Sequence, residues 1–279
     1  MSEAFFILSI LLLAAASGLS ILSLHGDSDR FHAHARRSFY LAGAFFLASG
    51  AVRYYPFALR DFVRIASTIW GHFYILALLL FLILAYIDLF RWSAHWRAVA
   101  AVALPFITVV CALFLPFLGS DRVMEVGLAN HLLPFHVIFS FMGQLFFFFS
   151  FTGSLLGIFL ENRLRRRSSL RSIQNFPSLE AIDAFIGWSL KRAAAFLAVG
   201  IVSGVALVWI NYGRVFLFSF KETVIYVSLF FIALLLYLRR DGRLGMMKLN
   251  AMNAALFGAV LAMYIASNVI LSSGFHSFR

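Results

Sequence analysis

Residues 134–160 read PFHVIFSFMGQLFFFFSFTGSLLGIFL, and this stretch contains no Asp, Glu, Lys or Arg. A helix needs about 20 apolar residues to cross a hydrocarbon core about 30 Å thick. Because lipid offers no hydrogen-bond partner to an open backbone, such a segment crosses the membrane as a helix. The stretch therefore predicts a membrane-spanning helix that carries His136 near its first turn.

The rest of the chain has the same apolar character. Its 279 residues are 62% hydrophobic and 13% charged, about half the charged fraction of an ordinary soluble domain. We therefore expect an all-α polytopic membrane protein, a single transmembrane domain over residues 1–279 with about eight spans. Their expected positions are 4–24, 38–56, 65–87, 98–118, 134–160, 188–210, 223–238 and 250–272.

A short amphipathic helix is expected on the cytoplasmic surface before the sixth span. Pro177-Ser178-Leu179-Glu180 is typical of a helix start, because Ser178 can cap free backbone amides and Glu180 lies in the favourable first turn. Apolar residues follow at spacings of three and four, at Leu179, Ile182 and Ile186. This pattern is typical of a helix that lies on the membrane and leads into Trp188.

The basic residues predict the orientation, because connections rich in Lys and Arg stay in the cytoplasm. The connections after the fifth and seventh spans carry Arg163, Arg165, Arg166, Arg167, Arg171, Arg239, Arg240, Arg243 and Lys248. The connections after the fourth and sixth spans hold few cations and belong outside. Both termini are then expected on the outer face. Topology thus accounts for the net charge of +11, and we expect no nucleic-acid partner.

Cysteine chemistry is limited to one thiol. Cys111 lies inside an apolar run, where a small buried side chain is expected, and the chain has no CxxC or CxxCH motif. It therefore has neither a dithiol redox pair nor an attachment site for covalent haem.

Two histidines are expected at the outer face. His136 opens the fifth span and His276 follows the eighth. Ionisable groups at a membrane edge mark functional sites, so the pair is a candidate set of metal or haem-iron ligands. A histidine bonded to a neighbouring helix, or a solvated one in the tail, is the simpler alternative. His131 is an alternative ligand, and His72, deeper in the third span, is a candidate cofactor contact.

The outer connection before the seventh span alternates aromatic and charged residues. Residues 211–223 read NYGRVFLFSFKET. Phe216 and Phe218 could stack on a flat macrocycle, and Arg214 or Lys221 could pair with its carboxylates. An aromatic belt that anchors the loop at the lipid headgroups is the competing interpretation.

This loop resembles the tryptophan-rich signature of the cytochrome c assembly family (CcsA, ResC and HemX types), which reads approximately WGRYWSWDPKET. Gly213, Arg214, Lys221, Glu222 and Thr223 match it. Further similarity lies at 176–183, at 135–137 and at 274–278, so that the resemblance covers about residues 130–279. Residues 1–125 are similar to the family only in their pattern of spans.

The resemblance implies a haem-handling protein of the bacterial inner membrane. In that family the two histidines that flank the aromatic loop are the expected axial ligands of an externally presented haem b, bound non-covalently. These roles carry over to His136 and His276. The implied partners are haem, a CcsB-like membrane protein and apocytochrome c, and the chain would be a possible component of a cytochrome c haem lyase.

The chain departs from the signature in ways that keep alternatives open. Tyr212, Phe216 and Phe218 replace tryptophans, Val215 replaces the tyrosine, and Ser219-Phe220 replaces Asp-Pro. Phenylalanine can still stack but lacks the indole N–H donor. A HemX-like structural or regulatory subunit that no longer binds haem is therefore the second hypothesis. A secondary transporter ranks third, because the sequence has no internal repeat.

Overall fold

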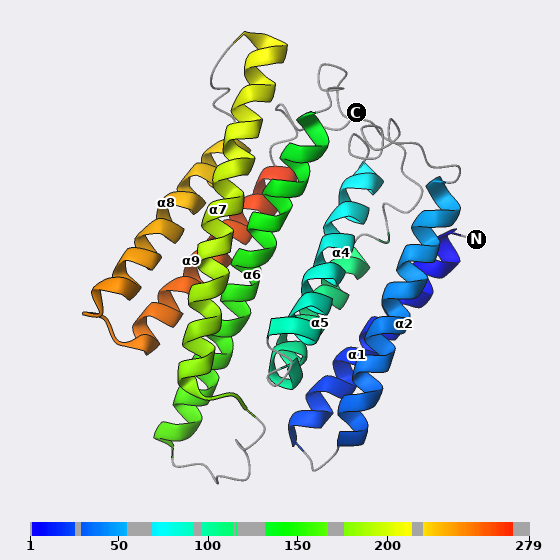
Figure 1. The fold of residues 1–279 in the computed structure, drawn as a ribbon, viewed down its shortest axis with the longest axis vertical. Helices are drawn as coiled ribbons and strands as arrows, with labels where there is room; N and C mark the ends of the chain where they lie inside the picture. The colour runs from blue at the N-terminus through cyan, green and yellow to red at the C-terminus, as the bar shows by residue number, and fades with distance from the viewer. Residues whose placement is uncertain are drawn as a thin grey trace. The chain divides into compact units, whose positions relative to one another are not determined.

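A computed structural model of the chain describes residues 2–25, 29–54, 69–91, 96–113, 115, 132–166, 176–213 and 220–269. These residues are almost entirely helical. The helices are α1 (Ser2–His25), α2 (Asp29–Tyr54), α4 (Ile69–Tyr86), the π-helix η1 (Ile87–Arg91), α5 (Trp96–Leu113), α6 (Leu132–Arg165), α7 (Leu179–Tyr212), α8 (Phe220–Asp241) and α9 (Met246–Val269) (Figure 1).

The expected all-α fold is confirmed, and each of the eight predicted spans corresponds to one α-helix. Among the described residues, five helices are long and apolar enough to cross a membrane: α1, α6, α7, α8 and α9. Shorter apolar helices occupy Tyr74–Leu89 and Arg97–Ala112. The chain is therefore a multi-pass membrane protein.

The amphipathic segment after Pro177 is helical but is not a separate element. It forms the first turns of α7, which continues without a break from Leu179 to Tyr212. Ile182 and Ile186 are buried, so the apolar stripe that suggested a membrane surface packs against other helices instead. A helix on a membrane surface and a helix packed against protein have the same amphipathic spacing, because the spacing indicates only that one face of the helix is covered.

The described chain forms two compact units. The first contains α1, α2, most of α4, η1, α5 and the end of α6 from residue 159, and the second contains α6 up to residue 158, α7, α8 and α9.

In the first unit, α1 packs against α2 and α5. Aromatic side chains join α2 to α4, with Phe46 stacked on Tyr74 at a centroid distance of 4.5 Å. Asp88 lies in the π-helix and is 2% exposed. Its Oδ2 accepts hydrogen bonds from Arg36 Nε at 3.0 Å and from Tyr40 Oη at 2.6 Å. The buried carboxylate thus ties η1 to α2.

In the second unit, phenylalanines fill the space between helices. Phe146, Phe147, Phe148 and Phe149 are all buried, so the run faces neighbouring helices and not lipid. Phe146 stacks on Phe196 of α7 with ring centroids 5.5 Å apart. Phe147 and Phe148 both contact Phe257 of α9.

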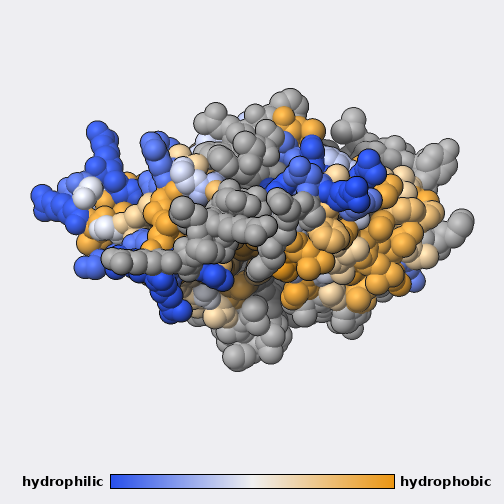
Figure 2. All heavy atoms as spheres, turned by 90° about the horizontal axis from the view of Figure 1, so that it is seen from below, coloured by the Kyte–Doolittle hydropathy of each residue, from blue (hydrophilic) through white to orange (hydrophobic). Residues whose placement is uncertain are grey.

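Large apolar side chains remain exposed on the outer faces of the helices, as expected where lipid replaces water. Figure 2 shows orange apolar surface beside blue hydrophilic side chains. The most exposed of these apolar residues include Leu11, Val202, Trp209, Phe230 and Tyr237.

Candidate functional site

His136 lies in the second turn of α6, as the sequence predicts. The helix begins at Leu132, and Pro134 occupies its first turn, where the missing N–H of proline costs no helical hydrogen bond. The imidazole is half-buried against α7.

One hydrogen bond determines which nitrogen of His136 carries its proton. Nδ1 lies 2.9 Å from the carbonyl oxygen of Gly200. A carbonyl oxygen can only accept, so Nδ1 must donate its N–H. In a neutral imidazole the lone pair is then on Nε2. This tautomer is the one in which Nε2 can ligate a metal.

Glycines on α7 allow this close approach. A Cβ at Gly204 would lie 2.8 Å from Cε1 of His136, and a Cβ at Gly200 would lie 2.8 Å from Oγ of Ser140. Gly200 and Gly204 are one turn apart on α7, as His136 and Ser140 are on α6. Small residues at such spacing let membrane helices approach closely.

Ser203 completes the surroundings of the imidazole. Its Oγ donates to the Gly200 carbonyl oxygen at 2.9 Å and lies 3.5 Å from His136 Nδ1. The Gly200 carbonyl therefore accepts from two side chains, one on each helix.

The aromatic loop of residues 211–223 begins at the end of α7. Gly213 has a φ of 64°, and its N–H bonds to the Trp209 carbonyl at 2.9 Å. This left-handed backbone favours glycine and ends α7. The next helix, α8, begins at Phe220, so Lys221, Glu222 and Thr223 lie in its first turn.

Most of the other predicted site residues are not placed. Arg214, Phe216, Phe218 and His276 lie outside the described residues, as does the alternative ligand His131. His72 is the fourth residue of α4, and Lys221 is the second of α8, but the side chains of both lie outside the described part. His136 is thus the one predicted ligand whose surroundings are described.

Clustered metal ligands and the single cysteine are the other candidates for metal or redox chemistry. Within the described ranges, no group of three or more His, Cys, Asp or Glu residues could hold a metal ion. Cys111 is a buried free thiol, as expected.

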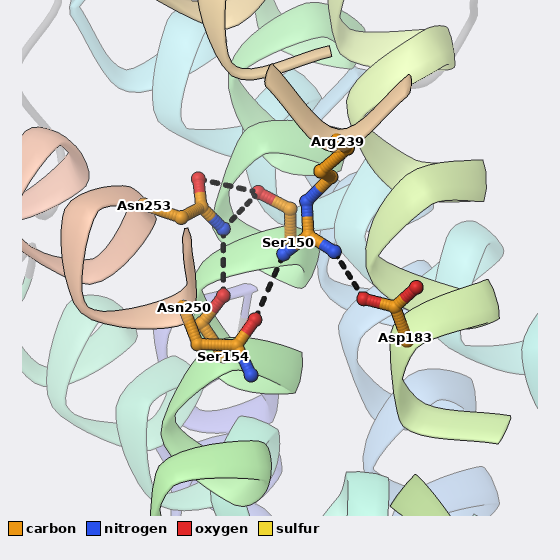
Figure 3. Close-up of polar contacts among 6 residues, drawn as sticks. All are labelled: Ser150, Ser154, Asp183, Arg239, Asn250 and Asn253. Carbon is orange, nitrogen blue, oxygen red and sulfur yellow. Dashed lines mark hydrogen bonds and ion pairs between the residues drawn. The ribbon is translucent and has the colours of Figure 1, made fainter. Parts of the chain in front are cut away.

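Sequence reasoning missed a polar cluster inside the second unit. Asn253 of α9 bonds to Ser154 at 2.8 Å and to Ser150 at 3.2 Å, both on α6 (Figure 3). All three residues are fully buried. The spacing of these polar residues within apolar spans could have indicated the cluster. Ser150 and Ser154 are four residues apart and Asn250 and Asn253 are three apart, so each pair lies on one face of its helix.

The same cluster contains an ion pair between α7 and α8. Arg239 donates to Asp183 and, through Nη2, to Oδ1 of Asn250 at 2.8 Å. The Arg239 side chain is 9% exposed. The sequence predicted Arg239 in the connection after the seventh span, but α8 extends to Asp241 and so includes it.

The fold is that of a polytopic helical membrane protein with a histidine oriented between two of its helices. The family model described as "Cytochrome C assembly protein" matches residues 65–276, roughly three quarters of the chain. The chain belongs to the cytochrome c assembly protein family. The match begins well before residue 130 and so includes α4 and α5, which had been placed only by their pattern of spans. No curated protein and no solved structure matches the chain significantly.

Proposed function

We propose that this protein binds haem b non-covalently at the outer face of a bacterial plasma membrane and presents it for attachment to apocytochrome c. Family membership supports a role in cytochrome c biogenesis. Haem binding and its location are the further steps that we propose.

The observation that carries the proposal is the hydrogen bond between His136 Nδ1 and the Gly200 carbonyl at 2.9 Å. Histidines that bind metals usually donate their second ring N–H to a carbonyl, a carboxylate or water, which sets the tautomer and the ring orientation. His136 has this arrangement. A buried structural histidine also needs a partner for its ring N–H, so the bond supports haem ligation only together with the family membership.

The remaining roles follow the family resemblance. His276 is proposed as the second axial ligand, Phe216 and Phe218 as the surface on which the macrocycle stacks, and Arg214 and Lys221 as partners of its carboxylates. His72 is a proposed additional contact. Bound haem would supply the iron centre and the vinyl groups that receive the thiols of the apocytochrome.

The proposed partners are a CcsB-like membrane protein and apocytochrome c. Both termini are proposed to lie on the outer face, because the positive-inside rule places the α6–α7 and α8–α9 connections in the cytoplasm.

The test is a reduced-minus-oxidised spectrum of the purified protein, isolated from haem-replete cells and also after haem is added. We expect a Soret band and b-type α and β bands in the wild type, and their loss in His136→Ala. His34→Ala is the matched control, because His34 is exposed on α2. A wild type with no haem spectrum under either condition would refute the proposal.

One observation favours a second candidate function, that of a structural or regulatory membrane subunit without haem. The signature tryptophans are absent, and Tyr212, Phe216 and Phe218 stand in their places. A protein that shows no haem spectrum and still copurifies with a membrane partner would support this alternative.

A further inference from the structure

We propose that Ser203 is a positioning residue that sets the strength of the hydrogen bond between His136 and Gly200, and thereby the electron-donating power of the His136 ring. The inference rests on the proposed function for its consequence at iron. The hydrogen bond itself can be tested without haem.

His136 and Ser203 share one hydrogen-bond acceptor. The carbonyl oxygen of Gly200 accepts from His136 Nδ1 at 2.9 Å and from Ser203 Oγ at 2.9 Å. Because Gly200 lies inside α7, the same oxygen also accepts the backbone N–H four residues later, and the two side chains share the accepting capacity that this bond leaves. Each donor draws electron density from the same oxygen, and each therefore weakens the bond made by the other.

The backbone of α7 next to the Nδ1–Cε1 edge of the ring limits any compensating movement. A Cβ at Gly204 would lie 2.8 Å from Cε1 and 3.0 Å from Nδ1 of His136. The imidazole thus rests against the backbone of α7, one turn beyond the carbonyl that it contacts. The ring is thus held in place. Loss of the Ser203 hydrogen bond to the Gly200 oxygen should therefore change the strength of the His136–Gly200 bond more than the position of the ring.

The consequence at the metal follows from the chemistry of imidazole. A stronger Nδ1–H···O bond shifts electron density toward Nε2, and such partners raise the basicity of a metal-bound histidine. A more electron-rich ligand favours ferric over ferrous iron. Because Ser203 also donates to the Gly200 oxygen, it would weaken the His136 hydrogen bond and keep the electron-donating power of the ring at an intermediate level.

The first experiment uses the full-length protein without haem. ¹⁵N NMR of ring-labelled histidine, assigned through His136→Gln, reports whether Nδ1 is protonated and how strongly it is bonded. We expect a protonated Nδ1 in the wild type, and Ser203→Ala to shift its proton resonance downfield toward a stronger bond. Ser203→Thr should match the wild type, because a helical threonine hydroxyl also reaches the carbonyl three or four residues earlier.

The second experiment measures the midpoint potential of bound haem. Ser203→Ala should shift it to more negative values, with Ser203→Thr unchanged. Ser228→Ala is the matched control, because Ser228 Oγ bonds to the Val224 carbonyl at 2.6 Å within α8. It removes a similar serine–carbonyl bond in a helix other than the two that hold His136 and Gly200.

The outcomes separate the two claims. A wild type without haem refutes the proposed function, and the NMR result then decides the role of Ser203 alone. A proton on Nε2 in place of Nδ1, or a Ser203→Ala spectrum identical to the wild type, overturns the inference whether or not haem binds. A potential that responds equally to Ser203→Ala and Ser228→Ala overturns it as well.

Gly204→Ala supplies an independent check on the ring position. The added methyl group would displace the imidazole, and we expect haem affinity to fall roughly 10- to 100-fold, as when other partners of metal-binding histidines are altered. Gly258→Ala is the control, because nothing lies within 4 Å of a Cβ at Gly258. Equal affinities in the two variants would contradict the packing argument.

Discussion

Arg239, two residues before the end of α8, donates a hydrogen bond to Asp183 in the second turn of α7. The same guanidinium bonds to Asn250 of α9 at 2.8 Å. One side chain therefore joins three helices at one end of the second unit (Figure 3). The two partners differ in exposure, because the Arg239 side chain is 9% exposed and that of Asp183 is 47% exposed.

This asymmetry predicts an order of stabilities. Asp183→Asn leaves a buried guanidinium without its counter-charge and should lower the free energy of unfolding by about 2–4 kcal/mol, somewhat less than for a fully buried pair. Arg239→Gln should cost less, because the half-exposed Asp183 can be solvated. The double variant should be more stable than Asp183→Asn alone. Thermal unfolding in detergent micelles measures all three.

The control for this series is an exposed ion pair. Arg243→Gln removes the 3.1 Å contact with Asp241, in which the arginine is 85% exposed and both residues lie at the surface, and should change stability by less than about 1 kcal/mol. Equal effects of Asp183→Asn and Arg243→Gln would show that the Arg239 pair behaves as a surface contact.

A second prediction concerns the packing of α6 against α7. A Cβ at Gly143 would lie 2.6 Å from Cγ and 2.8 Å from the backbone nitrogen of Leu197. Because backbone cannot yield as a flexible side chain does, Gly143→Ala should destabilise the protein by about 1–3 kcal/mol. Gly258→Ala, in open space, should be neutral or slightly stabilising, since alanine favours helix. The same micelle assay applies, and comparable losses in both variants would contradict the contact.

The proposed orientation predicts which residues a membrane-impermeant thiol reagent reaches. Gly245 lies in the connection between α8 and α9, is exposed, and has nothing within 4 Å of an added Cβ. In a Cys111→Ala background, Gly245→Cys should react only after the cells are opened. Ser277→Cys, beyond α9, should react in intact cells. The opposite pattern would invert the topology and place His136 at the cytoplasmic face.

A pH dependence is expected from His32, which precedes the second predicted span. Burial lowers the pKa of His32 below its usual 6.5, and the charges of Arg97 and Arg36 add to this effect against the weaker opposing influence of Asp88 and Asp29. The folded state thus disfavours the charged ring. The neutral His32 ring therefore stabilises the folded state. This contribution is complete above the unfolded pKa near 6.5 and is lost as pH falls through the lower pKa of the folded state.

The measurement is the pH profile of thermal stability. The wild type should lose stability below about pH 6.5 more steeply than His32→Gln, which does not titrate. Arg97→Gln should raise the pKa of His32 and make the profile shallower. Parallel profiles for the wild type and His32→Gln would exclude His32 as the cause.

The sequence by itself determined the fold class and the family. An apolar run such as residues 134–160 must be helical in lipid, because every backbone group must find its hydrogen-bond partner within the segment. The aromatic loop with Gly213, Lys221, Glu222 and Thr223 indicated the cytochrome c assembly family, which the match over residues 65–276 confirms. Both conclusions depend on local composition or order along the chain.

Only the tertiary structure decided what surrounds His136 and Arg239. Gly200 is 64 residues from His136, and Asp183 is 56 residues from Arg239. A single sequence does not specify which face of one helix meets which face of another. The first turns of α7 were wrongly predicted to lie on the membrane for the same reason. They bury Ile182 and Ile186 against protein, and periodicity predicts a covered face but not what covers it.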